Sequence, residues 1–173
     1  MKSTRIAAAI LGTTAVLVAS PALAGNTVGN TINLGLVIED ECTIQTDDLD
    51  FAPTGISDQN MDATGNIDIE CTNRTPYSIA LDAGTHAGVA GDVDTRRLKN
   101  AGTDFINYQL YSDTFSTVWG HTVGTDTVDS ASATGSGETI TVHARVPAKQ
   151  NVAIGTYTDQ VTATIWYADD AAP

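Results

Sequence analysis

The sequence predicts an all-β protein, a sandwich of short strands joined by long connections. Apolar and polar residues alternate with a period of two through short runs, as in strands that bury one face. Gly, Asp, Asn, Thr and Pro separate these runs, and helical spacing is scarce. Only 6% of the residues are aromatic and 15 are glycine, which suits small β-branched cores and many turns.

Residues 1–24 have the three-part build of a secretory signal peptide. A positively charged start precedes an apolar stretch at residues 6–18, and residues 21–24 supply the small side chains that signal peptidase accepts. An uncleaved membrane anchor is the alternative, but the apolar stretch is short for a bilayer span. We expect cleavage after Ala24, which leaves 149 of the 173 residues as one exported domain.

The mature chain is strongly acidic. Lys2 and Arg5 leave with the signal peptide, so six of the eight basic residues remain against 21 acidic ones, a formal charge of −15. Such a surface repels polyanions, and no basic stripe with interleaved aromatic residues offsets this repulsion. We therefore expect no nucleic-acid partner, and we interpret the acidity as a source of solubility.

The first structural feature of the mature chain is an alternating run at residues 26–38. One face carries all its large apolar side chains except Val37, with Asn30 as the single interruption: Val28, Ile32, Leu34, Leu36 and Ile38. The run leads through the acidic residues 39–41 into Cys42, where the body of the domain begins. By alternation alone, it is more typical of an ordinary first strand that pairs within its own chain.

Cys42 and Cys71 are the two cysteines, and an even count in an exported chain predicts one disulfide. Closing this loop of about 30 residues removes unfolded-state entropy worth about 3 to 4 kcal/mol. A zinc site is the alternative, but zinc normally takes four Cys or His ligands at close spacing, and no histidine lies near either cysteine. We expect the disulfide and no metal.

The body that follows is predicted to contain further strands. The clearest of them cover residues 65–71, 77–83, 106–112, 138–146 and 160–167. Between them, residues 124–137 form a Thr, Ser, Asp and Gly run that predicts a mobile loop. Asp82, Asp92 and Asp94 flank a Gly-rich loop without the spacing of a calcium site, so we expect a solvated acidic loop.

No catalytic constellation emerges from the sequence. His86, His121 and His143 lie far apart, with no paired spacing that would gather a metal. The only Gly-Ser-Gly run, at residues 135–137, lacks the frame of a nucleophile elbow. We expect no catalytic residues, no cofactor and no small-molecule substrate.

Three stretches of the mature chain occur in a distinctive order. The first comprises residues 42–44, 49–51 and 65–71; the second comprises residues 95–100 and 106–113; the third is a Gly-x-Tyr-x-Asp turn that feeds the last strand, at residues 155–165. Together they resemble the spore coat protein U domain, found in subunits of archaic chaperone–usher pili. The tail at residues 168–173 departs from this pattern, since the family commonly stops at the final strand.

The resemblance implies an incomplete immunoglobulin-like sandwich that lacks its last strand and exposes an apolar groove. The body would be residues 42–173, and its final strand would border the groove through Val161, Ala163, Ile165 and Tyr167. Residues 25–41 would be a donor-strand extension that fills the groove of a neighbouring subunit. In that case, Asn30 either enters a weak pocket that begins the exchange or lies beyond the groove.

The resemblance also implies the partners. A periplasmic chaperone would fill the groove first, and other pilus subunits would replace it at an outer-membrane usher. We therefore expect a structural pilus subunit at the cell surface, used for adhesion and biofilm. The alternatives are a secreted spore or cell-surface coat protein and a single-domain adhesin, although a tip subunit usually carries a second domain for which 149 residues leave no space.

Overall fold

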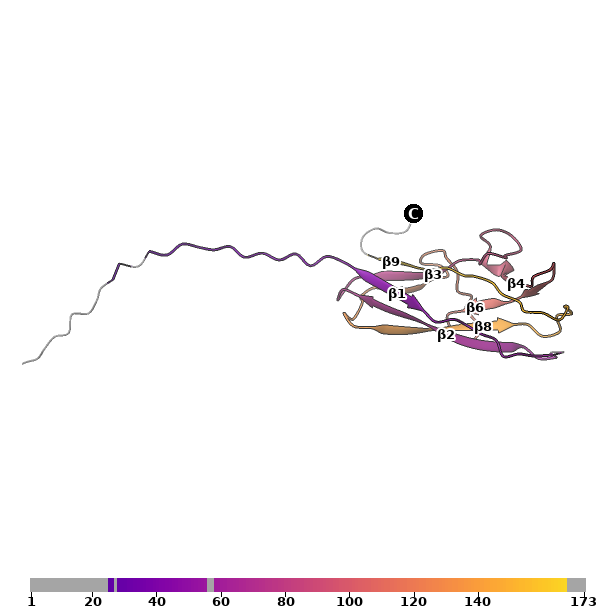
Figure 1. Cartoon of the computed structure of the whole chain (residues 1–173). Helices are drawn as coiled ribbons and strands as arrows, with labels where there is room; N and C mark the ends of the chain where they lie inside the picture. The colour runs from indigo at the N-terminus through magenta and orange to yellow at the C-terminus, as the bar shows by residue number, and fades with distance from the viewer. Residues whose placement is uncertain (1–24, 27, 56–57, 168–173) are drawn as a thin grey trace, which may run out of the picture. The chain divides into compact units, whose positions relative to one another are not determined.

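The computed structural model describes residues 25–26, 28–55 and 58–167 (Figure 1). The predicted signal peptide and the tail at residues 168–173 lie outside the described residues. The chain divides into two units, residues 1–36 and residues 37–173. Within the described part, no helix has the length and apolar character needed to cross a membrane.

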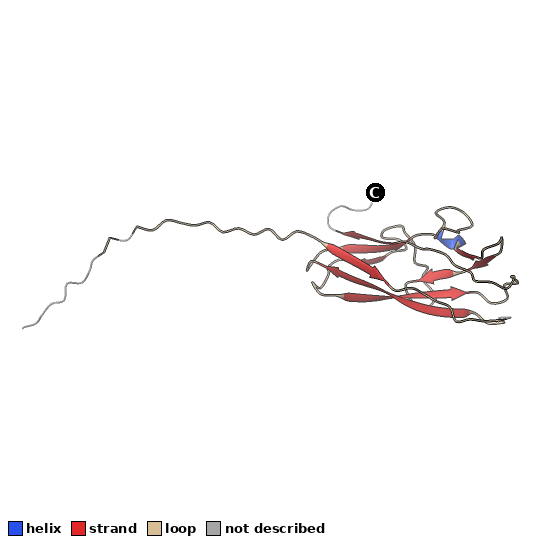
Figure 2. Ribbon diagram, viewed as in Figure 1, coloured by secondary structure: helices blue, strands red, loops and turns tan. Residues whose placement is uncertain are grey.

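The described part of the second unit is built from strands, with one short 3-10 turn (Figure 2). The strands are β1 (Cys42–Thr46), β2 (Met61–Cys71), β3 (Tyr77–Leu81), β4 (Arg97–Lys99), β5 (Phe105–Asn107), β6 (Gln109–Tyr111), β7 (Val128–Ser130), β8 (Glu138–Val146) and β9 (Ala163–Tyr167). The 3-10 turn covers Val93–Thr95. This confirms the predicted all-β class.

Two antiparallel sheets form an immunoglobulin-like sandwich. One has the strand order β1-β2-β8-β6 and the other β7-β3-β9, while β4 and β5 make a separate hairpin. Ile67 and Ile69 of β2 are 2% exposed and Ile79 of β3 is fully buried, so the core lies between the two sheets. Trp119, also fully buried, donates from its indole nitrogen to the Ile79 carbonyl over 2.8 Å.

Alternation along β2 and β8 explains why these strands pair as they do. In β2 the inward residues include Ile67, Ile69 and Cys71, while Asp68 and Glu70 are exposed. Because the side-chain period is two, one register aligns the apolar face of β2 with that of β8, and any one-residue slip would bury the carboxylates. The observed pairs, such as Ile67 with Ile140, keep both apolar rows on the core side.

The segment predicted as one strand at residues 106–112 is instead divided between two sheets, which corrects the prediction. Ile106 pairs with Leu98 in the hairpin, whereas Leu110 pairs with Ala144 in the four-stranded sheet. Between them, the N–H of the buried Tyr108 donates to the Arg96 carbonyl over 3.1 Å. The chain therefore changes sheets at Tyr108.

Residues 124–137 are not a simple loop, which is a second correction. Val128 of β7 stands opposite Ile79 of β3 and packs against the core. The last strand is also shorter than predicted, because β9 begins at Ala163 and Val161 precedes it. The pairing of Val128 depends on β3, which lies far away in the sequence.

Candidate assembly site

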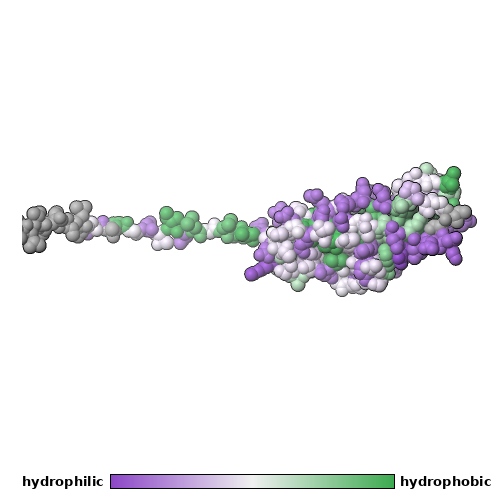
Figure 3. Space-filling view, turned by 90° about the horizontal axis from the view of Figure 1, so that it is seen from below, coloured by the Kyte–Doolittle hydropathy of each residue, from purple (hydrophilic) through white to green (hydrophobic). Residues whose placement is uncertain are grey.

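The apolar row of the N-terminal extension is exposed. No strand is assigned to the described residues from 25 to 41, and the relative exposures are 99% for Val28, 82% for Ile32, 93% for Leu34, 85% for Leu36 and 74% for Ile38. Green apolar side chains alternate with paler and purple ones along this segment in Figure 3. Val37, on the opposite face, is also exposed. Several large apolar side chains in succession are unusual on a soluble surface and are typical of an interaction segment.

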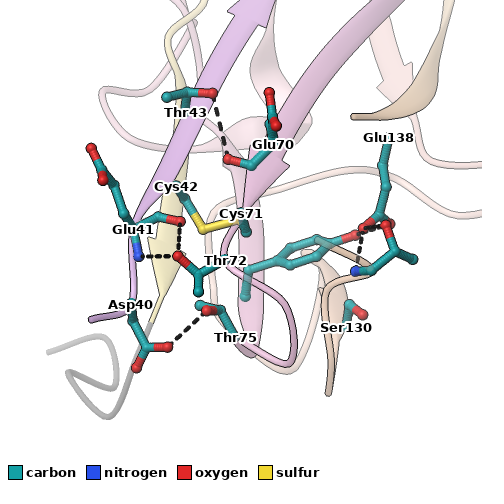
Figure 4. The surroundings of a disulfide bond; sticks show 12 residues. Asp40, Glu41, Cys42, Thr43, Glu70, Cys71, Thr72, Thr75, Ser130 and Glu138 are labelled. Carbon is teal, nitrogen blue, oxygen red and sulfur yellow. Dashed lines mark hydrogen bonds between the residues drawn. A yellow bond between two sulfur atoms is a disulfide. The ribbon is translucent and has the colours of Figure 1, made fainter. Parts of the chain in front are cut away.

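The extension leads into a disulfide that fastens β1. Cys42 and Cys71 are bonded, as predicted, and stand opposite each other in the β1–β2 ladder (Figure 4). Nearby, the Tyr77 hydroxyl donates to Glu138 over 3.2 Å. Burial raises the pKa of Tyr77, and the negative charge of Glu138 acts in the same direction. The start of β1 is thus tied to β2 both covalently and through the ladder.

β1 and β9 are edge strands of the two facing sheets. Among the described strands, β1 pairs only with β2, and β9 pairs only with β3. The two edges lie close to each other without a hydrogen-bonded ladder between them. Their outer backbone groups therefore remain available for an additional strand.

A cavity of ≈ 330 Å³ lies between the sheets beside these edges. Its lining includes apolar side chains from both sheets and from the segment after β1: Leu49, Phe51, Leu110, Val142, Val161 and Ala163. We call the region formed by this cavity and the unpaired edges of β1 and β9 the β1–β9 groove. Green patches also interrupt the hydrophilic surface of the body in Figure 3.

The four residues predicted to border the groove lie on one side of the last strand and its approach. Val161, Ala163, Ile165 and Tyr167 are half-buried and pack against the core, whereas Thr162 and Thr164 are exposed. Val161 and Ala163 line the cavity itself. The structure therefore brings the four residues into one row.

A buried carboxylate holds the start of this row. The Asp159 side chain is 2% exposed. It accepts hydrogen bonds from the Thr85 hydroxyl (2.7 Å), the His86 N–H (3.1 Å) and the Tyr108 hydroxyl (2.7 Å). Burial of the Tyr108 side chain raises its pKa well above the usual range, and the hydrogen bond to the Asp159 carboxylate contributes in the same direction. Sequence reasoning missed this cluster, although Asp159 is the acid of the Gly-x-Tyr-x-Asp turn.

Asp82, expected in a solvated acidic loop, is half-buried and makes a second connection to the approach of β9. Its Oδ1 accepts from the Thr162 N–H over 3.0 Å and from the Gly84 N–H over 2.9 Å. Gly84 has φ +76°, and a Cβ atom there would collide with the Asp159 carboxylate. The turn after β3 therefore requires glycine at this position.

Arg96 braces the opposite side of the same turn. It is 1% exposed, and its guanidinium donates to the Leu81 carbonyl over 2.8 Å and to the Asp82 carbonyl over 2.6 and 2.9 Å. Further bonds of 2.8 Å reach the Trp119 carbonyl and Gln109 Oε1. Burial lowers the pKa of Arg96, yet every partner is an oxygen that stabilises the cation.

The histidines are not gathered into one site. His86 Nδ1 lies 2.9 Å from Asp159 Oδ1, His121 is exposed, and His143 on β8 contacts the Phe115 ring. Over the described ranges, no group of three or more His, Cys, Asp or Glu side chains is placed to hold a metal ion.

Comparison with known proteins adds the family. The model of the Spore Coat Protein U domain matches residues 29–164. The chain belongs to this family. Protein U of Myxococcus xanthus is 37% identical over 108 residues, which cover 60% of this chain and 59% of that protein. This spore coat U chain therefore spans about three fifths of that relative's length.

A solved structure is similar to this spore coat U domain. It is the chaperone–tip adhesion subunit pre-assembly complex CsuC–CsuE, from the archaic chaperone–usher Csu pili of Acinetobacter baumannii. The match has a TM-score of 0.56 and 22% identity, and covers 74% of this chain and 40% of that chain. This likeness supports the sandwich fold.

Proposed function

We propose that this chain is a structural subunit of a chaperone–usher pilus that polymerises by donor-strand exchange. One observation carries the proposal: the same chain contains an exposed, one-faced extended segment and a sandwich with two unpaired edges beside a cavity whose lining includes apolar side chains from both sheets. An extended segment that adds to an open edge gains backbone hydrogen bonds, and its alternate side chains enter the pockets between the sheets. The extension thus supplies an additional strand, and the open edges of the sandwich supply the backbone partners for it.

The two apolar rows match in length. Ile32, Leu34, Leu36 and Ile38 span seven residues, as do the four inward residues from Val161 to Tyr167. At about 3.3 Å per residue, each row extends over roughly 20 Å. We propose the register in which Ile32 to Ile38 face this row, because these four apolar residues follow one another without a polar interruption. Asn30 then lies outside the groove and needs no apolar pocket.

The burial energy is sufficient for a durable contact. Burying the four apolar side chains that face the β9 row at about 1.5 to 3 kcal/mol each gives a gross gain of about 6 to 12 kcal/mol before ordering costs. Each copy would use one surface to donate and a different one to accept. Repetition of such a head-to-tail contact generates a filament.

The same groove explains the proposed partners. Before assembly the apolar side chains in its lining need a temporary occupant, which we propose is a periplasmic chaperone that is replaced at an outer-membrane usher. The similar solved complex, which contains a chaperone and a pilus tip subunit, supports this route. We place the assembled fibre at the cell surface and assign it to adhesion and biofilm formation.

A coat protein is the second candidate function. Membership of the Spore Coat Protein U domain family and the 37% identity with Protein U favour it. Strand exchange would then build a surface layer. Immunogold electron microscopy of the native cells separates the two functions: projecting labelled fibres support the pilus, whereas a continuous labelled layer supports the coat.

The experiment that tests strand donation compares Leu34→Asp with Asn33→Asp. Both variants add one negative charge to adjacent positions, but only Leu34 belongs to the apolar row. We expect purified mature Asn33→Asp protein to form detergent-resistant fibres like the wild type, and Leu34→Asp protein to remain unassembled in electron micrographs. Normal fibres from Leu34→Asp would refute the donor role.

A further inference from the structure

Residues 39–41, which we call the root, connect the extension to β1, and two threonines hold them. Thr72 Oγ1 donates to the Glu39 carbonyl over 3.1 Å and accepts from the Glu41 N–H over 3.2 Å. The Thr72 N–H donates to the Glu41 carbonyl over 2.8 Å. Thr75 Oγ1 donates to Asp40 Oδ1 over 2.7 Å. Every residue of the root is therefore bonded to the turn after β2; Figure 4 shows the bonds of Asp40 and Glu41.

The threonine turn is itself firmly held. Thr75 is fully buried, although the root that it binds is exposed. The Thr75 N–H donates to the Thr72 carbonyl over 3.1 Å, and the Arg74 N–H donates to the Ala133 carbonyl over 2.9 Å. Arg74 has φ 73°, which closes the turn tightly. The disulfide of Cys71 stands directly before it.

This arrangement is unusual for a segment of such composition. Three successive carboxylates repel one another, and an exposed acidic linker between two structured parts is normally extended and free. Instead, a main-chain group or side chain of each root residue has a fixed partner in residues 72–75. The threonine turn and the root together form what we call the root clamp.

We propose that Thr72 and Thr75 are positioning residues that fix the direction in which the extension leaves its own body. This inference rests on the proposed function. In a fibre the extension lies in the next subunit, so the root alone joins two bodies. Three residues have about six soft backbone dihedrals, which would let the bodies swing freely. The root clamp removes this freedom and thereby sets the angle between successive subunits.

The test measures fibre stiffness in Thr72→Val/Thr75→Val, which removes both hydroxyl groups and preserves side-chain shape. Thr139→Val is the matched control, because Thr139 Oγ1 on β8 also donates to a carboxylate, that of Asp68 over 2.6 Å, but touches neither the root nor the edges of the groove. We expect all three proteins to form fibres. The persistence length in electron micrographs should fall to about half or less in the double variant, as for a flexible linker, and stay unchanged in the control.

A second readout follows the clamp in the unassembled chain. The Glu41 N–H loses its acceptor in the double variant, so its hydrogen exchange should become about fivefold faster, as for the loss of one hydrogen bond. If the buried substitution at Thr75 makes the double variant unstable, Asp40→Ala removes the hydrogen bond between Thr75 and Asp40 by changing the exposed partner instead. Its fibres should also be more flexible than those of the wild type.

The outcomes separate the clamp from the proposed function. Flexible variant fibres with faster Glu41 exchange support the root clamp. Variant fibres as stiff as the wild type refute it and leave strand donation intact. If wild-type and Thr139→Val chains themselves form no fibres, the proposed function fails, and the positioning role fails with it.

Discussion

A few polar residues keep the β9 side of the groove in place, and each of their side chains has hydrogen-bond partners in the protein. Asp159 and Asp82 receive hydrogen bonds from the turn after β3, and Arg96 donates to the carbonyls of the same turn. Removing one partner of such a group leaves a buried polar atom unpaired, which costs about 1 to 3 kcal/mol. The residues that hold the β9 side of the groove are therefore polar, beside the apolar side chains that line part of the cavity.

Gly84→Ala tests how tightly this turn is packed. The new methyl group meets the Asp159 carboxylate in a backbone conformation with φ +76°, so we expect a loss of about 2 to 4 kcal/mol in the free energy of unfolding. Gly91→Ala is the control, since Gly91 has φ +78° and open space around it. Its loss should stay near 1 kcal/mol, the cost of the left-handed conformation alone. Equal losses in urea unfolding would contradict the packing argument.

The raised pKa of Tyr108 should make the free energy of unfolding decline at alkaline pH. Burial and Asp159 raise its pKa in the folded protein, so folding keeps Tyr108 protonated at a pH where the unfolded chain ionises. The resulting stabilisation is fully present below pH ~10, the usual tyrosine pKa, and is lost as the pH rises beyond it. Urea unfolding between about pH 8 and 11 should show a shallower decline for Tyr108→Phe than for the wild type.

Thr85→Val provides the comparison for this effect. It also removes a hydrogen bond to Asp159 but leaves Tyr108 in place. Its alkaline slope should equal that of the wild type. If Tyr108→Phe shows that slope too, the decline comes from other groups.

At the level of elements, the groove is bordered by two edge strands that are secured differently. β1 is joined to β2 by a ladder of five pairs and by the disulfide. β9 has a ladder of five pairs with β3 and is preceded by the polar turn described above. Neither element has a second neighbour among the described strands.

Cys42→Ser/Cys71→Ser should weaken the sandwich without changing its topology. The bond joins residues with a sequence separation of 29, so its loss restores unfolded-state entropy worth about 3 to 4 kcal/mol. Calorimetry of the double variant should show a clearly lower Tm than that of the oxidised wild type. The reduced wild type should match the variant; a change below about 1 kcal/mol would mean that the ladder alone secures β1.

The elements also show what the sequence can and cannot predict. β8 matches its predicted range, 138–146, because nine residues alternate without interruption. β7 was missed because Val128 is a single large apolar residue in a polar run. The division at Tyr108 depends on Arg96, twelve positions earlier, and the Asp159 cluster gathers residues from three distant segments. The alternation of apolar and polar residues cannot indicate such contacts, because the partners are distant in the sequence.

The candidate site was predictable to a similar extent. Alternation identified the apolar rows of the extension and of the last strand, and the cysteine count identified the disulfide. Alternation did not favour donation over an ordinary first strand, because the period of two is the same whichever sheet receives the segment. The root clamp was not predicted either, since its bonds join residues more than 30 positions apart.

For the whole molecule, the proposed function treats one chain as two incomplete halves. A chain that carries a second copy of residues 26–38 after Pro173, through a flexible linker, should complete itself. We expect it to be monomeric in size-exclusion chromatography, with a higher Tm than the unassembled wild type, because burying the apolar row contributes several kcal/mol. Aspartate at the copied positions of Leu34 and Leu36 should abolish both effects; stabilisation that persists with aspartate would refute groove filling.

The unequal fastening of the two groove margins has a mechanical consequence. The chain has only two cysteines, and both serve the β1 margin, so the β9 margin has no covalent link and depends on reversible hydrogen bonds and side-chain packing. Local opening of the sandwich should accordingly displace the β9 margin more than the β1 margin, which the disulfide holds in place. An incoming strand would then be admitted by the compliant side and aligned by the rigid one.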